Sequence, residues 1–305
     1  MKNESLTDWL ENRFGKHIKN IVLFFIVIYL ISLVLATTKE TMDWITTTFL
    51  FETPSIAIII PFTLLCIFLA YSGLRSIAIC SSVLLPLVVL LGILVATGNI
   101  PTKDYSHLLP LFENGYFNGI KSFQYSAYGL SELILLTFFQ EKLTDTISRK
   151  GLVFLCIGLV FLLFGPLTGG IAEFGPTLAE AMRYPAYEQW RLLTIGKYIE
   201  HTDFFSIYQW LAGAYIRVSL ALFLLTDVIN IKTNKMKVAI PFAVGFLMVI
   251  VSIVPYSNFK FLHITQTFYY PGALYFLIIL STFLFIGTFI SSKEGKKHEN
   301  ETIQK

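Results

Sequence analysis

Residues 20–37 have the sequence NIVLFFIVIYLISLVLAT, which carries no charge and is apolar at nearly every position. At about 1.5 Å of rise per residue, a helix of this length approaches the roughly 30 Å of a bilayer's hydrocarbon core. The run lacks the alternation of a barrel strand, and only helices and closed barrels satisfy their backbone hydrogen bonds inside lipid. The stretch therefore predicts a transmembrane α-helix.

Seven further runs of this kind follow, so the chain is predicted to be an all-α polytopic membrane protein of eight spans. The predicted spans are residues 20–37, 54–71, 76–97, 119–140, 151–171, 206–229, 238–254 and 267–290. They form one membrane domain, residues 19–290. An N-terminal segment, residues 1–18, precedes it and a polar tail, residues 291–305, follows it.

The composition excludes several classes of protein. Of the 305 residues 55% are hydrophobic and 14% are charged, and the mean hydropathy is +0.67. Soluble domains carry about 25% charged residues. A net charge of +3 without a long basic run argues against a nucleic-acid partner. Cys66, Cys80 and Cys156 fit no metal or disulfide spacing, and no enzyme motif is present, so we predict no catalytic residue, metal or cofactor.

The positive charges predict an orientation. With the N-terminus inside, fifteen of the 23 lysines and arginines fall in cytoplasmic segments and seven, including Lys39, fall in outer segments. This bias places both termini in the cytoplasm. Leu6, Trp9, Leu10 and Phe14 recur at helical spacing and predict an amphipathic helix lying on the inner membrane surface. A soluble arm is the alternative.

Two ionisable residues fall inside predicted spans, Glu132 in the fourth and Arg217 in the sixth. A charge at the bilayer centre costs about 2.5–3.5 kcal/mol on insertion scales, so such residues are candidates for a functional site. Two hypotheses stay open. The pair forms an interhelical tie without a ligand, or one or both residues border a polar cavity. Asp227, near the inner end of the sixth span, is predicted to be interfacial.

The fourth span is polar and aromatic over residues 122–128 and apolar over residues 133–139, with Gly129 between the two halves. Transporters use broken helices of this kind to bind substrate, although a glycine in a membrane helix is also a common packing contact. In the last span, residues 269–270 and Pro271 predict an aromatic belt and the start of a helix.

The most distinctive strings lie in the outer segment 173–205, where Tyr187, Trp190 and Leu193 predict an interfacial helix. They are Tyr184-Pro-Ala-Tyr-Glu-x-x-Arg191-Leu-Leu and Gly196-x-Tyr-Ile-Glu-x-x-Asp203, followed by Trp210. Together with Phe51-Glu-Thr-Pro54, Gly73-Leu-Arg75, the stretch Ser126–Glu132 and the segment Leu6–Gly15, they resemble the B-subunit, or permease, family of spore germination receptors (GerAB-like). The likeness runs from about Ser5 to Ile290.

The resemblance implies a fold and a role. Such proteins look like members of the amino acid–polyamine–organocation superfamily, with LeuT-like inverted repeats of five helices. Relatives have ten spans, so this chain appears to lack the first two, which indicates a truncation or a mis-assigned start. The implied role is to bind a small germinant, often an amino acid, in the inner membrane of the dormant spore, together with an A subunit and a lipoprotein C subunit.

The resemblance also implies ligand-facing positions. They are Tyr29, Leu33, Tyr125, Ser126, Gly129, Glu132 and Arg217. Two alternatives remain beside the receptor subunit. One is an amino acid secondary transporter of the same superfamily, and the other is a truncated, non-functional fragment.

Overall fold

The computed structural model describes residues 4–110, 115–145, 147–194, 196, 201–231, 233–254 and 257–290. Among these, six helices are long and apolar enough to cross a membrane, and Ser55–Tyr71 is a shorter apolar helix. The fourth predicted span, residues 119–140, is helical but changes from α-helix to 3-10 helix after Ser131. The prediction of an all-α polytopic membrane protein is confirmed. The polar tail, residues 291–305, and residues 197–200 of the second outer string lie outside the described part.

The chain divides into two compact units, and the boundaries fall within α5 (Tyr116–Ser131) and α8 (Phe205–Val228). The first unit comprises Met1–Leu74, Ala127–Thr146 and Arg217–Lys305. Its further elements are α1 (Leu6–Phe14), α2 (Lys16–Thr48), α3 (Ser55–Tyr71), the 3-10 helices η3 (Glu132–Phe138) and η4 (Gln140–Lys142), α9 (Asn234–Ile253), α10 (Asn258–Ile264), a π-helical turn (Thr265–Tyr269) and α11 (Tyr270–Thr288).

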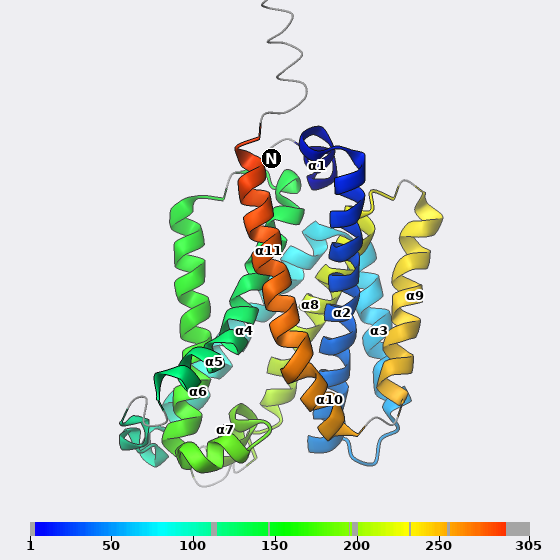
Figure 1. Ribbon diagram of the computed structural model, residues 1–305. Coiled ribbons are helices and arrows are strands. Elements are labelled where there is room, and N and C mark those ends of the chain that lie inside the picture. The colour runs from blue at the N-terminus through cyan, green and yellow to red at the C-terminus, as the bar shows by residue number, and fades with distance from the viewer. Residues whose placement is uncertain are drawn as a thin grey trace, which may run out of the picture. The chain divides into compact units, whose positions relative to one another are not determined.

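Helices α2, α3 and α9 lie side by side in the first unit (Figure 1). The approach of α9 to α3 depends on Gly245. A Cβ atom there would lie 2.8 Å from Ile67 Cδ1 and 2.9 Å from Thr63 Cγ2. Small residues allow this close packing between membrane helices, where van der Waals contact replaces the hydrophobic effect.

We expect Gly245→Ala to lower the stability of the protein by about 1 kcal/mol, because the added methyl group overpacks the α3–α9 contact. Thermal unfolding in detergent measures this effect. The matched control is Gly272→Ala on α11, where an added Cβ meets none of the described atoms within 4 Å. Equal melting temperatures for the two variants would contradict the assignment.

Helix α2 is longer than predicted, since it ends at Thr48 and not near residue 37. The placement of Lys39 in an outer loop is therefore wrong. Lys39 Nζ lies 2.8 Å from Asp43 Oδ1, one turn further along the helix, and both side chains are more than nine-tenths buried. Thr41 also donates to the Thr37 carbonyl at 2.7 Å. These local bonds satisfy polar side chains within the helix, so polarity does not end it.

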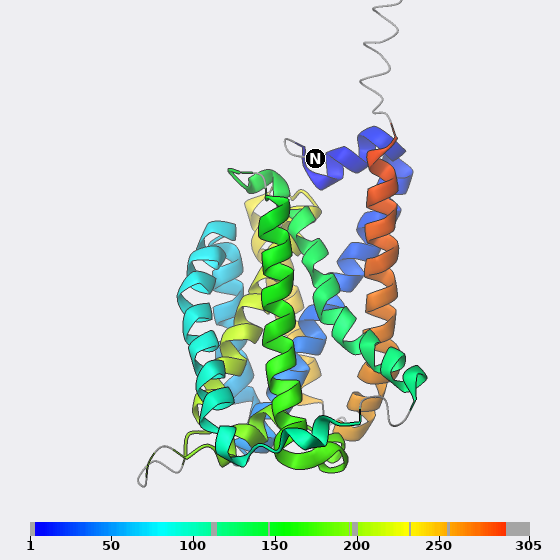
Figure 2. The same ribbon diagram turned by 90° about the vertical axis from the view of Figure 1, so that its left-hand side faces the viewer.

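The predicted amphipathic helix α1 is confirmed, but its apolar side is covered by protein, with Trp9 1% and Leu10 0% exposed. Figure 2 shows α1 beside the C-terminal end of α11. There Phe14 stacks on Phe283 with ring centroids 4.5 Å apart. Arg13 Nη1 donates to the Gly287 carbonyl at 2.8 Å and also to Thr288 and Ile290 carbonyls. A cation here satisfies carbonyls that a helix end leaves unpaired.

The second unit comprises Arg75–Ser126 and Ile147–Ile216. Its elements include α4 (Leu74–Gly98), η1 (Ile100–Thr102), η2 (Tyr105–Leu108), α6 (Arg149–Ala181) and α7 (Pro185–Leu192). Helix α6 continues past the predicted end at residue 171 and bends at Gly175, whose φ is 72°. Figure 2 shows α7 lying across the end of α6.

Helix α7 confirms the helix predicted in the long segment 173–205, while its position at the outer membrane surface stays a prediction. Its Trp190 packs with Leu193 against Leu91 and Val95 of α4. The indole Nε1 of Trp190 donates to Gln209 Oε1 at 3.1 Å. The distinctive string of this segment is therefore part of a packed core, in addition to any role in binding.

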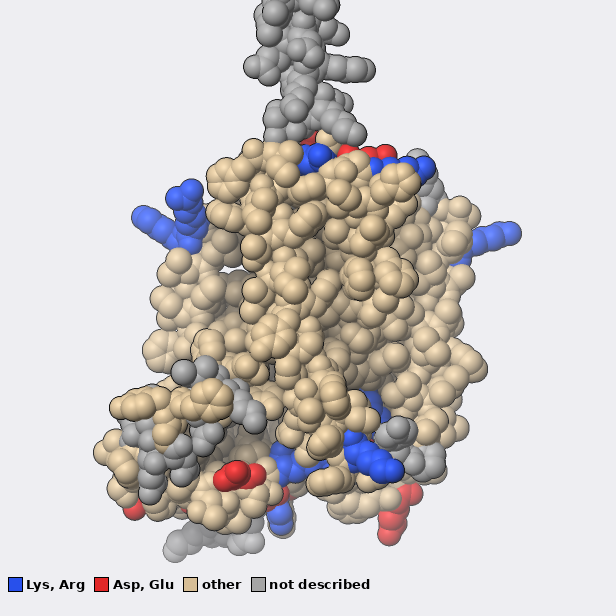
Figure 3. All heavy atoms as spheres, in the orientation of Figure 1, with Lys and Arg blue, Asp and Glu red and all other residues tan. Residues whose placement is uncertain are grey.

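Charged side chains on the face formed by α2, α9 and α11 gather at its two ends, with an uncharged belt between them (Figure 3). Large apolar side chains stay exposed in this belt, for example Phe24 at 60%, Phe246 at 67% and Ile279 at 67%. A soluble protein would bury such residues, so this belt is the lipid-facing surface.

Candidate functional site

The fourth predicted span is broken, as one of the two hypotheses held, but the break does not lie at Gly129. Helix α5 continues through Gly129 to Ser131, and the chain then forms the 3-10 helix η3 from Glu132 to Phe138. The Ser131 hydroxyl donates to the Tyr128 carbonyl at 2.7 Å, which ties down the last turn of α5. The alternative that Gly129 is a packing contact is wrong, since an added Cβ meets none of the described atoms within 4 Å.

Glu132 opens the 3-10 helix and forms an ion pair with Arg217 of α8. Arg217 Nε donates to Glu132 Oε2 at 3.1 Å, and Nη2 donates to Oε1, so the pair is bidentate. The same Nη2 also donates to the Tyr128 hydroxyl at 3.1 Å. Planar bidentate contact is the strong geometry for a guanidinium and a carboxylate. The two charges that the sequence places inside the membrane thus neutralise each other.

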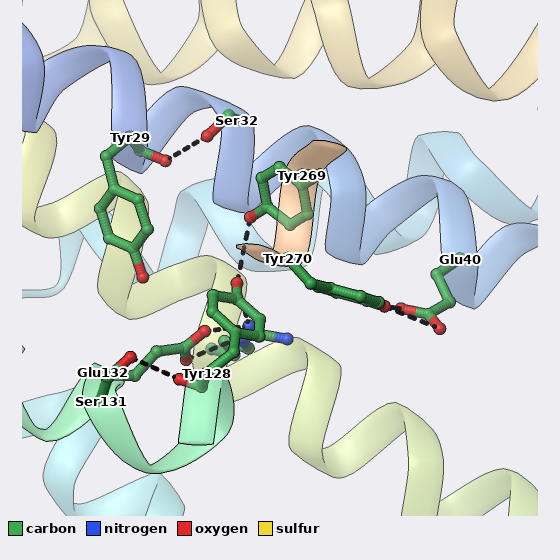
Figure 4. A network of polar contacts seen from close by, with 9 residues as sticks. Tyr29, Ser32, Glu40, Tyr128, Ser131, Glu132, Tyr269 and Tyr270 are labelled. Atoms are coloured by element: carbon green, nitrogen blue, oxygen red, sulfur yellow. Dashed lines mark hydrogen bonds and ion pairs between the residues drawn. The ribbon is translucent and has the colours of Figure 1, made fainter. Parts of the chain in front are cut away.

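Two tyrosines from the last span extend this network (Figure 4). The Tyr269 and Tyr128 hydroxyls lie 3.1 Å apart, and the Tyr270 hydroxyl donates to Glu40 Oε2 of α2 at 3.3 Å. Tyr269 closes the π-helical turn, a rare feature that is frequent at functional sites. As predicted, an α-helix begins at Tyr270 with Pro271 in its first turn, although α10 and the π-helical turn precede it. The aromatic belt stays a prediction, and the hydroxyls of both tyrosines contact protein groups.

Tyr29 of α2 reaches the same network. Its side chain is 3% exposed and extends toward Tyr128 and Glu132 (Figure 4). Its hydroxyl interacts with the Tyr128 side chain, but it forms no hydrogen bond of normal geometry with the described residues. A buried hydroxyl without a full hydrogen bond costs up to about 1–3 kcal/mol, so this position favours a further hydrogen-bonding group. Leu33 follows one helical turn later and is fully buried.

The ion pair is accessible from one side. The Arg217 side chain is 35% exposed and the Glu132 side chain 16% exposed, although both lie within apolar spans. The Tyr128 side chain, by contrast, is 5% exposed, and its hydroxyl accepts from the guanidinium. The pair is therefore only partly exposed, and a binding cavity beside it stays a prediction.

The structure brings some of the predicted residues together and leaves others apart. Tyr29, Glu132 and Arg217 lie in one unit and surround Tyr128. Tyr125 and Ser126 belong to the other unit, where Tyr125 is 42% exposed and Ser126 half-buried. Their part in binding therefore stays a prediction.

Glu40 was missed as a site residue, and so were three tyrosines of the network, namely Tyr128, Tyr269 and Tyr270. Tyr128 is four residues before Glu132, so helical spacing places both side chains on one face and signals a shared environment. No comparable signal was available for the other two, since a tyrosine pair near a span end is typical of an interfacial belt.

Chemically, the network offers one cation, the carboxylates of Glu132 and Glu40, and several tyrosine hydroxyls, which suits recognition of a small polar solute. Among the described residues, no three His, Cys, Asp or Glu side chains gather as a metal site requires. The groups that the network presents are hydrogen-bond donors and acceptors and fixed charges.

Comparison with known proteins agrees with these features. A family model described as spore germination protein, the spore permease family, matches residues 1–260. The chain is 38% identical over 295 residues to spore germination protein XB of Bacillus anthracis. The aligned region covers 97% of this chain and 83% of that protein. No solved structure matches the chain. The family is not an enzyme family. The chain therefore belongs to the spore permease family of spore germination proteins and is a multi-pass membrane protein of germination.

Proposed function

We propose that this protein is the membrane subunit of a spore nutrient-germinant receptor, and that the Glu132–Arg217 site binds an amino acid germinant whose arrival triggers germination. The observation that carries the proposal is the buried Tyr29 hydroxyl, which forms no hydrogen bond of normal geometry with the described residues and extends toward the pair. An ion pair alone would serve as a structural tie. A buried donor without a full hydrogen bond beside it favours a ligand.

An amino acid suits the site because it carries both charges of the pair. Its carboxylate would take the two guanidinium donors of Arg217, and its ammonium group would take the Glu132 carboxylate. Each protein charge exchanges one partner for another, so no ion is left unpaired in the low-dielectric interior. The Tyr29 and Tyr128 hydroxyls would complete the hydrogen bonds. A neutral sugar would separate the pair without replacing its charges.

The cellular setting follows from the family and from the charge pattern. We propose the spore inner membrane as the location and A and C germination-receptor subunits as partners, on the strength of the family membership. We propose that both termini are cytoplasmic. Moving Lys39 from an outer loop into α2 strengthens the positive-inside bias that supports this orientation.

The variant Tyr29→Phe is expected to weaken germinant binding without lowering the stability of the protein. Removal of a buried hydroxyl without a full hydrogen bond leaves the folded protein as stable as before or slightly more stable. The amino acid concentration for half-maximal germination is expected to rise about tenfold, as for the loss of one good hydrogen bond of about 1.4 kcal/mol. The germination of spores from a gene-deletion strain carrying the variant, tested with twenty L-amino acids, measures this shift.

The matched control is Tyr71→Phe, which removes a hydroxyl from a tyrosine of α3 that is 64% exposed. It should behave as wild type in both measurements. A Tyr29→Phe protein that is clearly less stable, or that responds at unchanged concentrations, would show that the hydroxyl is satisfied within the protein and does not meet the germinant.

A transporter of amino acids is the second candidate, favoured by the change from α-helix to 3-10 helix at Glu132. Uptake of a labelled amino acid into vesicles that contain the protein distinguishes the two. Accumulation driven by a proton or sodium gradient would identify a transporter. Saturable binding without accumulation would identify a sensor.

A further inference from the structure

A second ion pair joins the same two segments that carry the Glu132–Arg217 pair. Lys142 of η4 pairs with Asp227 near the end of α8. Lys142 follows Glu132 by ten residues, and Asp227 follows Arg217 by ten residues. Along the broken segment the acidic Glu132 precedes the basic Lys142, whereas along α8 the basic Arg217 precedes the acidic Asp227. The two segments therefore run in the same direction with their charges matched at both ends.

The spacing fixes one alignment of the segments. Ten residues of α8 advance about 15 Å, and the 3-10 segment must advance by a similar distance to meet both partners. Between the charges, residues 133–136 and 138–139 are apolar, and Ile134, Leu135 and Phe138 are buried. Apolar side chains specify an alignment weakly, because neighbouring registers bury similar groups. Two ion pairs of opposite order specify it strongly, since a shifted register leaves charges unmatched.

Register matters here because the segment is a 3-10 helix. Runs of this helix longer than three or four residues are uncommon and have poorer hydrogen-bond geometry, whereas η3 has seven residues. A slip of one residue would rotate its side chains by about 120° and move them by about 2 Å. Glu132, the first residue of η3, would then lose its bidentate contact with Arg217.

Lys142 makes two contacts with α8, which suits an anchor. Its ammonium group pairs with Asp227 and also lies 4.9 Å from the centroid of the Phe223 ring, one turn earlier. The pair is partly hydrated, with side-chain exposures of 31% and 21%, and Asp227 and Phe223 line a cavity of about 300 Å³. A partly hydrated pair adds little to stability, so its loss should leave a folded protein.

We infer that Lys142 and Asp227 are positioning residues that hold Glu132 opposite Arg217 by locking the register of the broken span on α8. The inference rests on the proposed function of that site. The ion pair does not touch the germinant and acts through the placement of the Glu132 carboxylate.

The experiment uses spores of a gene-deletion strain that carry the full-length variants, tested with the L-amino acid to which wild-type spores respond best. Lys142→Gln and Asp227→Asn should each raise the concentration for half-maximal germination about three- to tenfold, the range found for residues that couple to a site without touching its ligand. The reversed pair, Lys142→Glu with Asp227→Lys, should restore the wild-type concentration within about twofold, because opposite charges again meet at the same register.

Immunoblots of spore membranes show whether each variant accumulates, and the reversed pair is compared with the single variants at equal amounts of protein. The control is Glu11→Gln, which breaks the Glu11–Lys19 pair in the same unit away from the broken span and should change nothing. Unchanged single variants, or single variants that the reversed pair does not rescue, would overturn the inference. A further outcome would also overturn the inference. In it, Lys142→Gln and Asp227→Asn fail to accumulate, and the reversed pair accumulates normally but does not restore the germination response.

The variant Glu132→Gln distinguishes failure of the positioning inference from failure of the proposed binding function. If the site binds germinant but Lys142 and Asp227 do not position it, Glu132→Gln weakens the response while the single variants at the second pair respond as wild type. If the site binds no germinant, Glu132→Gln compared at equal amounts of protein, and the double variant Glu132→Gln with Arg217→Gln that leaves no charge unpaired, respond as wild type to every amino acid tested.

Discussion

Arg217→Leu is expected to abolish the response to amino acid germinants and to destabilise the protein. The substitution leaves Glu132 beside Tyr128 without its cation. Removal of one partner from a fully buried pair costs 3–5 kcal/mol. Because the Arg217 side chain is 35% exposed, we expect about 2–3 kcal/mol here. Loss of the carboxylate-binding fork should raise the half-maximal germinant concentration at least about thirtyfold.

The double variant Glu132→Gln with Arg217→Gln separates the two effects. It removes both charges, so the melting temperature in detergent should return most of the way toward wild type, while germination stays lost. Arg191→Leu is the matched control, since it breaks an exposed pair with Glu188 in the other unit and should leave stability nearly unchanged. A double variant that germinates normally would sink the assignment of the pair as the binding site.

Trp9→Ala is expected to cost about 3–5 kcal/mol of stability, the usual range for deleting a buried indole. Trp9 is 1% exposed, and its ring edge packs against Gly287 of α11. A Cβ atom added at Gly287 would lie 2.6 Å from Trp9 Cη2. The Arg13 guanidinium also lies 4.8 Å from the indole ring. The loss of the ring would release both Arg13 and the end of α11. Thermal unfolding in detergent measures the change.

Phe24→Ala on α2 provides the comparison, because the Phe24 ring is 60% exposed on the lipid-facing surface. In detergent it should shift the melting temperature little. Were α1 held only by lipid, Trp9→Ala would resemble Phe24→Ala in detergent and would instead weaken binding of the segment to vesicles. Equal melting temperatures for Trp9→Ala and Phe24→Ala would therefore indicate that α1 is an amphipathic helix held by the membrane surface.

The sequence alone predicted most of the fold, because hydropathy is decided by each residue and its solvent. Over the described residues each apolar run is largely helical, with the fourth changing to a 3-10 helix at Glu132, and α1 and α7 appeared where apolar side chains recur at helical spacing. The other errors lie at helix ends. Helix α2 extends to Thr48 because Lys39 and Asp43 pair within it, which polarity by itself cannot reveal. The last span begins before Tyr269 for a similar reason, since the π-helical turn has no distinct composition.

The candidate site, too, was predicted from the sequence only in part. Glu132 and Arg217 stand out from the sequence because a charge is costly in lipid wherever it occurs. Their mutual contact joins positions 85 residues apart, and the partners of Tyr128 and Tyr269 are further still. Only packing decides which distant side chains meet and which hydroxyl, as at Tyr29, is left without a full hydrogen bond. Local chemistry thus determined the kind of protein and its costly residues, whereas long-range contacts determined how those residues are satisfied.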